Sequence, residues 1–273
     1  MSMSKIRKTA GALCLVFLTF QMNGQQESPY QINWKKDLAV LGGSAGLFSV
    51  GFALANGVDP LSVEEISLLD RRDVVGFDRS ATRRYSTTAS DISDGLLLTS
   101  IVLPFSLVAG KKIRSNLGST ALLLGESFFI TAGITNIAKG LTKRTRPFAY
   151  NSEVPIEKKT GNSTRLSFFS GHVSSSAVLS FFTAKVYSDY YPDSKFKPLV
   201  WTAAATLPAV TALHRYLAGK HYPSDVLAGY VVGALTGYFV PHFHKKKRAG
   251  KNLHVIPTTN LNGGQSMTFL LTF

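Results

Sequence analysis

The chain of 273 residues is long enough for one large domain or two small ones. It carries a net charge of +14, although only 17% of its residues are charged and 45% are hydrophobic. A basic chain can bind nucleic acid, anionic lipid or small anions. Nucleic acid is the weakest of these here, because the lysines and arginines lie between apolar runs rather than along one polar face. The single cysteine, Cys14, excludes a disulfide framework and a cysteine metal site.

The first 24 residues have the three parts of an export signal. Lys5, Arg7 and Lys8 form a positive start, AGALCLVFLTF forms an apolar run, and QMNGQQES forms a polar exit. The pattern predicts a signal peptide over 1–24 that is cleaved near Gly24. The alternative is an uncleaved N-terminal membrane anchor.

Six further apolar segments follow, each about long enough for a helix. The third and the sixth approach the roughly 20 residues that a membrane-spanning helix needs. The mean hydropathy of the whole chain, +0.10, is low for a protein with six spans. The sequence therefore predicts an all-α fold, a bundle of about six core helices, and favours its embedding in a membrane. The segments are 38–55, 95–110, 117–138, 173–188, 199–213 and 225–240.

Two strongly basic loops indicate how the segments are oriented. KKIRSN (111–116) and HFHKKKRAGK (242–251) should both stay cytoplasmic if the helices span. Four segments separate them, so the turns around 139–172 and 214–224 share the opposite side. A cleaved signal would start the mature chain outside, and we therefore expect 38–55 to lie against the bundle rather than cross it.

A polar insert, 56–94, separates the first two of these segments. Its arginines and aspartates are nearly balanced, a pattern typical of short solvated helices. Arg83 and Arg84 are candidates for capping a site at this end of the bundle.

The C-terminal tail changes character. Two alternating runs, LHVIPTT and QSMTFLLTF, flank Asn262-Gly263-Gly264, which is a strong β-hairpin signal. One hairpin cannot close a membrane barrel. The sequence therefore predicts one helical domain, 25–251, with an appended β-hairpin, 252–273.

Three separated pieces of sequence carry residues suited to phosphate chemistry. They are the stretch from Lys139 to Arg146-Pro147, SFFSGHVSSS (167–176) and HRYLAGKHYPSD (214–225). All three lie at predicted helix ends on one side. In the first piece, Lys139 and Arg146 supply positive charge, and the planar guanidinium group can hold two phosphate oxygens.

The second piece resembles a helix N-terminus. Ser170 occupies the N-cap position, where its hydroxyl and the amides of Gly171 and His172 could point at an anion that the helix dipole favours. Gly171 has no Cβ to obstruct a ligand.

The third piece combines a cation, an imidazole and a carboxylate. Arg215 adds a second guanidinium group, and Pro223 pre-sets the first turn of the last helix. In that turn Asp225 could accept a hydrogen bond from one ring nitrogen of His221 and leave the other nitrogen free as a nucleophile.

Each piece alone has an ordinary structural explanation. Lys139 and Arg146 alone could be interfacial cations or lipid head-group contacts. Ser170 and His172 alone would be a helix cap and a packed histidine. All three pieces, in this order and at matching helix ends, favour a catalytic site.

Together the pieces resemble a known signature. Lys-x6-Arg-Pro, Ser-Gly-His and Arg-x5-His-x3-Asp, over residues 139–225, form the three-part pattern of the type-2 phosphatidic acid phosphatase superfamily. This superfamily includes lipid phosphate phosphatases, class A acid phosphatases and vanadium haloperoxidases. Two positions depart from its pattern, because Phe169 replaces a proline and His214 replaces a serine.

The resemblance implies a role for each residue. His221 attacks phosphorus and becomes a phosphohistidine, Asp225 orients His221, and His172 protonates the leaving oxygen and then activates water. The implied chemistry needs no metal and no other cofactor. The residues that would hold the non-bridging phosphate oxygens are Lys139, Arg146, Ser170, Gly171 and Arg215.

The predicted function is a metal-independent phosphatase that acts on a lipid phosphate or diphosphate. Its expected partners are the phosphorylated lipid and the membrane, and nucleic acid is not among them. We expect it in the inner membrane of a bacterial cell envelope, with the site facing the periplasm. The alternatives are a soluble periplasmic acid phosphatase of broad specificity, a vanadium haloperoxidase and a non-catalytic binder of anionic lipids.

Overall fold

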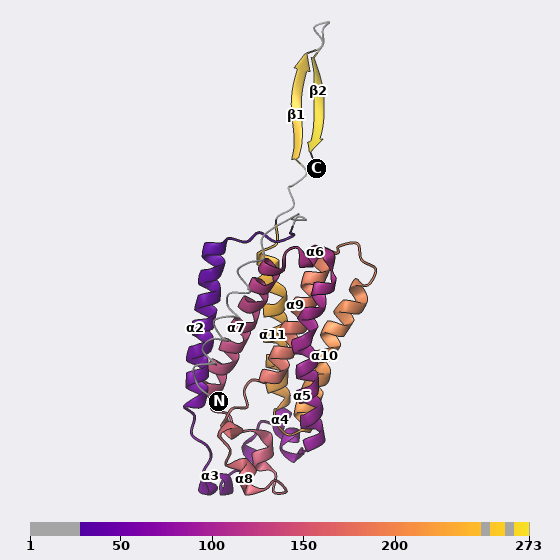
Figure 1. Ribbon diagram of the computed structural model, residues 1–273. Coiled ribbons are helices and arrows are strands. Elements are labelled where there is room, and N and C mark those ends of the chain that lie inside the picture. Colours follow the sequence, from indigo (N-terminus) through magenta and orange to yellow (C-terminus); the bar gives the residue numbers. More distant parts are fainter. Residues whose placement is uncertain (1–27, 247–251, 260–264, 273) are drawn as a thin grey trace, which may run out of the picture.

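Six long helices dominate the computed structural model, which describes residues 28–246, 252–259 and 265–272 (Figure 1). The predicted signal peptide or anchor, 1–24, lies outside these residues. Each predicted apolar segment coincides with one long helix or with its immediate extension, so the all-α bundle of six core helices is confirmed. The long helices are α2 (Trp34–Asn56), α5 (Thr87–Val102), α7 (Leu117–Thr142), α9 (Gly171–Tyr190), α10 (Lys197–Leu217) and α11 (Pro223–Phe243).

The helix α9 forms the centre of the bundle. It packs against α5, α7, α10 and α11, and 13 of its 20 residues are buried. The six helices run alternately up and down along a common direction (Figure 1). A central helix needs polar links as well as apolar contacts in a membrane-like bundle, and α9 has them. Ser176 bonds to Ser100 of α5 at 2.7 Å, and Ser174 bonds to Thr135 of α7 at 3.0 Å.

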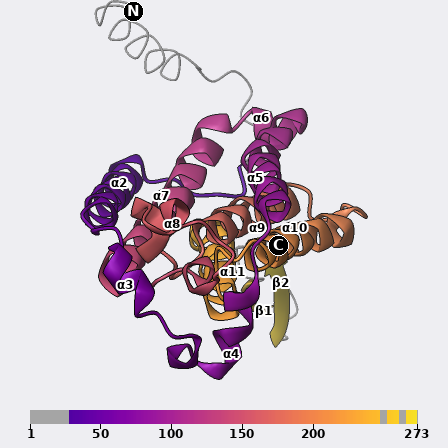
Figure 2. The same ribbon diagram turned by 90° about the horizontal axis from the view of Figure 1, so that it is seen from below.

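Short helical segments surround one end of the bundle, which Figure 2 shows from below. The predicted short helices of the polar insert are present, but α5 begins earlier than expected, at Thr87. Ser86 caps it, because its hydroxyl accepts a hydrogen bond from the Ala89 amide at 3.2 Å. The segments at this end are α3 (Val63–Ser67), η1 (Arg71–Asp73), α4 (Gly76–Arg79), η2 (Ser80–Arg83), η4 (Pro147–Tyr150), α8 (Ile156–Lys159) and η5 (Asn162–Arg165). At the other end lie η3 (Leu103–Ala109) and α6 (Lys111–Arg114).

Four helices of the described chain are long and apolar enough to cross a membrane. Many large apolar side chains on the outer faces are exposed, among them Leu98, Leu199 and Leu227. An exposed apolar belt of this kind is a feature of a membrane protein. The candidate spans are Trp34–Asn56, Thr87–Ala109, Leu117–Tyr150 and Pro223–Phe243.

The segment 38–55 lies against the bundle as expected, and its not crossing the membrane stays a prediction. The helix α2 packs on the outside of α7, but it extends from one end of the bundle to the other (Figure 1) and is itself a candidate span. Glycines make this contact close. A Cβ on Gly51 would lie 2.8 Å from the Gly133 carbonyl oxygen, and a Cβ on Gly140 would lie 2.7 Å from the Leu54 Cβ.

A second row of glycines brings α11 against α9. A Cβ on Gly229 would lie 2.7 Å from the Ser170 carbonyl oxygen, and one on Gly233 would lie 2.2 Å from the Ser174 carbonyl oxygen. Both distances are too short for any side chain. This close contact sets the first turn of α9 next to the first turn of α11.

The predicted C-terminal hairpin is confirmed. β1 (Asn252–Thr259) pairs with β2 (Gln265–Thr272) in antiparallel register, from Asn252 opposite Thr272 to Thr259 opposite Gln265. The pairing leaves 260–264 between the strands, where the sequence places Asn262-Gly263-Gly264.

Replacing Gly233 with Ala should lower stability by about 2 kcal/mol, because the added methyl group forces α9 and α11 apart. The measurement is thermal unfolding of the purified protein in detergent. Gly46→Ala is the matched control, since nothing lies within 4 Å of a Cβ at that position of α2. Equal melting temperatures for the two variants would contradict the packing argument.

Candidate active site

The three predicted pieces of sequence meet at the end of the bundle that carries the short segments (Figure 2). The Lys139 Nζ donates to the Leu166 carbonyl oxygen at 2.6 Å, which links the end of α7 to the segment before α9. The Ser170 amide donates to the Asp225 carbonyl oxygen at 3.1 Å, which links α9 to α11. The expectation that these pieces share one end is confirmed.

A glycine positions the loop between α10 and α11. Gly219 has a φ of +68°, and a Cβ there would lie 2.0 Å from the Arg84 carbonyl oxygen. Its own carbonyl oxygen accepts a hydrogen bond from the Phe148 amide at 2.9 Å. The loop that carries His221 is therefore held between the polar insert and the segment that follows Arg146.

The imidazole of His221 is buried and its tautomer is determined by one contact. The Nδ1 atom lies 2.8 Å from the Ser167 carbonyl oxygen. Since a carbonyl oxygen only accepts hydrogen bonds, the proton is on Nδ1, and Nε2 keeps its lone pair. Burial and the charges of Lys139, Arg146 and Arg215 hold the pKa of His221 well below its usual value. The imidazole is therefore neutral at pH 7, the form that can act as a nucleophile.

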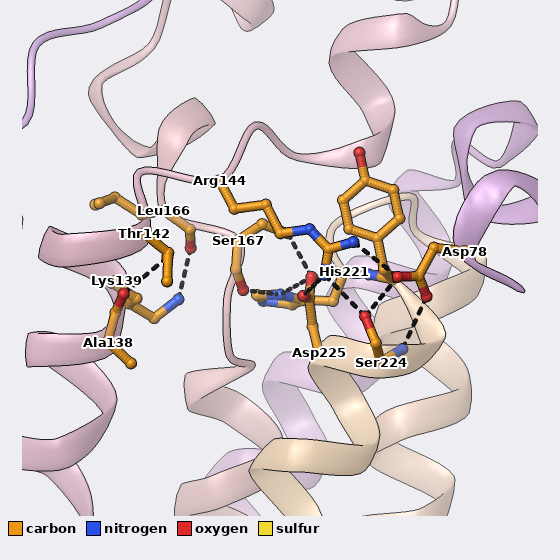
Figure 3. A network of polar contacts seen from close by, with 11 residues as sticks. Asp78, Ala138, Lys139, Thr142, Arg144, Leu166, Ser167, His221, Ser224 and Asp225 are labelled. Carbon is orange, nitrogen blue, oxygen red and sulfur yellow. Dashed lines mark hydrogen bonds and ion pairs between the residues drawn. The ribbon is translucent and has the colours of Figure 1, made fainter. Parts of the chain in front are cut away.

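Asp225 does not make the direct hydrogen bond to His221 that the sequence suggested. Its Oδ2 lies 3.6 Å from the His221 Nδ1. That oxygen already accepts from the Ser167 hydroxyl at 2.5 Å and from the Tyr222 amide at 3.0 Å. Asp225 thus holds His221 indirectly, because it fixes Ser167, whose carbonyl oxygen contacts the ring (Figure 3).

Two residues that the sequence reasoning missed complete this network. Arg144 donates to the Asp225 Oδ1 at 2.5 Å and to the Asp78 Oδ2 at 2.7 Å, and its guanidinium group lies 4.0 Å from the centre of the Tyr222 ring. Asp78 also accepts from the Ser224 amide and hydroxyl, at 2.9 and 2.5 Å. Burial alone would raise the pKa of Asp78, but the hydrogen bonds from Ser224 and Arg144 hold it below its usual value.

Little in the sequence marks these two residues. Arg144 lies inside the Lys-x6-Arg spacer, and Asp78 is one of several acidic residues in the polar insert. The one available signal is that the insert is adjacent to the site in the predicted topology. Arg83 and Arg84, the residues expected to cap the site, have exposed side chains, and their capping role stays a prediction.

Buried donors without partners gather around His221. The side chains of Arg146, Ser170 and Arg215 each have a buried polar atom with no hydrogen-bond partner in the described structure, namely Nε, Oγ and Nε. A buried donor that lacks a partner costs roughly 1–3 kcal/mol. An anion with several acceptor oxygens would satisfy these donors and neutralise the neighbouring positive charges.

His172 lies in the first turn of α9 and faces an aspartate. Its Nε2 is 2.7 Å from the Asp94 Oδ1. The same oxygen lies 3.4 Å from the Arg215 Nη1, and Arg215 also donates to the Ser93 hydroxyl at 3.1 Å. Asp94 is a further residue that the sequence reasoning missed, because it was assigned to the polar insert rather than to the second turn of α5.

The remaining predicted details have mixed outcomes. Ser170 is the N-cap of α9, as expected, but its hydroxyl does not cap the helix. A Cβ on Gly171 would make ordinary contacts at 3.7 and 3.8 Å, so the need for a glycine there stays a prediction. The Nδ1 of His214 faces the Val210 carbonyl oxygen at 2.9 Å within its own helix, so this nitrogen is not available to the site.

Comparison with known families finds a match for the part of the chain that contains this site. A family model described as the PAP2 superfamily matches residues 120–249, a range that contains all eight predicted site residues. This part of the chain, just under half of it, is similar to the PAP2 superfamily. The match agrees with the resemblance inferred from the motifs.

The comparisons with curated proteins and with solved structures give no match or a distant one. No curated protein matches the chain. Among solved structures, the crystal structure of the first transmembrane PAP2 type phosphatidylglycerolphosphate phosphatase from Bacillus subtilis is similar, with a TM-score of 0.45 and 20% sequence identity. The match covers 73% of this chain and 94% of that one.

Replacing Arg144 with Ala should lower stability by about 3 kcal/mol, because it leaves the buried carboxylates of Asp78 and Asp225 without their shared cation. Thermal unfolding in detergent measures this loss. The control is Arg72→Ala, which breaks an exposed ion pair with Asp70 and should leave the melting temperature unchanged. If both variants unfold like the wild type, the network does not stabilise the fold.

Proposed function

We propose that this protein is a phosphatase of the PAP2 type and that it hydrolyses a lipid phosphate or lipid diphosphate through a phosphohistidine at His221, without a metal in the reaction. One observation carries the proposal. A neutral imidazole with a free Nε2 lies among three cations, of which Lys139 and Arg215 are buried and Arg146 is half-buried. The guanidinium groups of both arginines have a buried Nε–H without a partner. This arrangement fits a tetrahedral dianion whose oxygens are held while phosphorus faces the imidazole.

The mechanism follows from the positions of the side chains. The Nε2 of His221 attacks phosphorus, an N–P bond forms, and the bond from phosphorus to the leaving oxygen breaks. His172, whose Nε2 lies 2.7 Å from the Asp94 Oδ1, gives a proton to that oxygen. Burial and the charge of Arg215 lower the pKa of His172 to about 4, so this step requires the negative charge of the bound phosphate to raise that pKa. His172 then takes a proton from water, which attacks phosphorus and releases phosphate and free His221. Lys139, Arg146 and Arg215 hold the non-bridging oxygens in both steps.

Asp225 is a positioning residue in this scheme. Its carboxylate fixes Ser167 and lies 3.6 Å from the Nδ1 of His221. At that distance the negative charge stabilises the positive ring that forms when His221 is phosphorylated.

A groove beside the site supports a lipid substrate. It lies between α10 and α11, has a volume of about 450 Å³ and is almost wholly apolar. Tyr216 and Pro223 in its wall are sequence neighbours of Arg215 and of the His221 loop. We assign it to the hydrocarbon chain of the substrate, which would reach the site from the bilayer. The lining residues are Phe77, Ala209, Ala212, Leu213, Tyr216, Pro223, Val226, Leu227 and Tyr230.

The charge distribution supports an orientation. Lys111, Lys112 and Arg114 of α6 and Lys245 after α11 lie at the end opposite His221. Basic residues next to spanning helices stay cytoplasmic. We therefore propose that the site faces the periplasm, in the inner membrane of a bacterial envelope. The candidate spans favour this over a soluble periplasmic acid phosphatase.

Replacing His221 with Ala should reduce phosphate release at least about 10³-fold, because the nucleophile is removed. The assay measures inorganic phosphate from lipid mono- and diphosphates in mixed micelles, before and after brief exposure to EDTA. Activity should persist with EDTA. The control is His242→Ala, an exposed position at the opposite end, which should retain full activity.

Three results would contradict this proposal. Undiminished activity in His221→Ala would exclude the phosphohistidine. Halide oxidation that depends on added vanadate, with no phosphate release, would assign the site to the haloperoxidase branch. If no substrate in the screen is hydrolysed and His221→Ala binds anionic lipid vesicles like the wild type, the protein is a non-catalytic binder of anionic lipids.

Replacing Leu227 with Asn should lower kcat/KM roughly fivefold for a long-chain lipid phosphate, because the groove loses apolar contact with the chain. A short, water-soluble phosphate ester should be hydrolysed as before. Leu235→Asn is the matched control, since Leu235 is exposed on the same helix and does not line the groove. Equal effects of the two substitutions would assign the substrate chain to another surface.

A further inference from the structure

Two buried carboxylates and a half-buried histidine converge at the end of the bundle opposite His221. They are Asp37 in the first turn of α2, Glu126 in the third turn of α7, and His244, the residue after α11. One ligand atom from each lies within 4.8 Å of the other two. Asp37 is 6% exposed and Glu126 is fully buried.

The acceptors that face one another in this cluster include two without a donor among the described residues, the oxygens of Glu126. The Nδ1 of His244 faces the Val240 carbonyl oxygen at 2.8 Å, which places the proton on Nδ1. The Nε2 lone pair therefore faces the Asp37 Oδ1 at 3.4 Å and the Glu126 Oε2 at 3.8 Å. Neither oxygen of Glu126 has a hydrogen-bond partner in the described part of the chain.

Such an arrangement is strongly unfavourable without a positive charge at its centre. Two carboxylates and an imidazole lone pair repel one another, and a fully buried carboxylate without a partner costs several kcal/mol. Either a metal ion or a shared proton must balance the acceptors. The lysine nearest in sequence, Lys245, pairs instead with Asp189 at 2.5 Å.

We propose that Asp37, Glu126 and His244 form a site for a divalent transition-metal ion of the Zn²⁺ class. One imidazole nitrogen with two carboxylate oxygens is a ligand set that Zn²⁺ accepts, with a water as fourth ligand. Ligands at about 2.0–2.2 Å in a tetrahedron lie roughly 3.3–3.6 Å apart. The separations of 3.4 and 3.8 Å need only a small side-chain adjustment to reach this geometry.

Hydrogen bonds made by the far side of the ligand groups orient His244 and Asp37, as is usual for metal ligands. The Nδ1–H of His244 is held by the Val240 carbonyl oxygen, which orients Nε2 toward the centre. The second oxygen of Asp37 accepts a hydrogen bond from the Asn33 amide at 2.8 Å. Both ligands are therefore oriented before any metal binds.

The position of the site indicates a structural role. It joins α2, α7 and α11, and the His244 carbonyl oxygen accepts a hydrogen bond from the Gln31 amide at 2.8 Å. It lies at the other end of the bundle from His221 (Figure 1). A metal there would stabilise the fold and take no part in phosphate chemistry, so the phosphatase proposal stands or falls independently.

The test uses the full chain, purified in detergent, stripped with a chelator and then titrated with ZnCl₂. We expect one Zn²⁺ per chain by elemental analysis and a melting temperature that rises by roughly 5 °C at saturation. Glu126→Gln and His244→Ala should both lose the stoichiometric zinc and the temperature rise. Phosphate release, measured well below the melting temperature, should be unchanged in Glu126→Gln.

Asp189→Asn is the matched control. Asp189 is a buried carboxylate at the same end, but its oxygens are paired with Lys185, Lys245 and the Tyr30 hydroxyl. This variant should bind one Zn²⁺ like the wild type.

Two sets of results would exclude the metal site. If the wild type binds no stoichiometric zinc and Glu126→Gln melts at a higher temperature, a shared proton balances the cluster and the metal site is excluded. Loss of zinc in Asp189→Asn as well as in Glu126→Gln would also overturn the proposal, because binding would then depend on overall folding rather than on these ligands.

Discussion

The buried carboxylate of Asp225 connects the parts of the catalytic end. It accepts hydrogen bonds from the Ser167 hydroxyl, the Tyr222 amide and Arg144, so it joins α11, the segment before α9 and the segment after α7. A buried carboxylate is tolerable only when such donors surround it. Its removal would free Ser167, whose carbonyl oxygen determines the tautomer of His221. The orientation of His221 therefore depends on a residue that does not bond to it directly.

The two ends of the bundle differ in the kind of buried polar group that lacks a hydrogen-bond partner. Around His221 the buried groups without partners are donors, on Arg146, Ser170 and Arg215. At the other end they are acceptors, on Glu126, beside the Nε2 of His244. Because unpaired buried groups are costly, each kind indicates a ligand of the complementary charge. The first fits a phosphate group, and the second fits a cation.

Much of the fold could be predicted because helix-length apolar runs leave few alternatives. All six segments became long helices, and alternation of direction placed the three motif pieces at one end. The main error occurred where polar sequence is helical. The start of α5 at Thr87 was missed because its first turns are polar, and no local pattern shows the close contacts that Gly51 and Gly140 make between α2 and α7.

The sequence by itself determined the candidate site, since the spacing of its motifs resembles one superfamily signature. Its residues are Lys139, Arg146, His172, Arg215, His221 and Asp225. Only the tertiary structure decided which atoms contact which. It placed Ser167 rather than Asp225 against the Nδ1 of His221, and it brought Arg144 and Asp78 into the network. These contacts join positions tens of residues apart, so they depend on how the helices pack rather than on any local pattern.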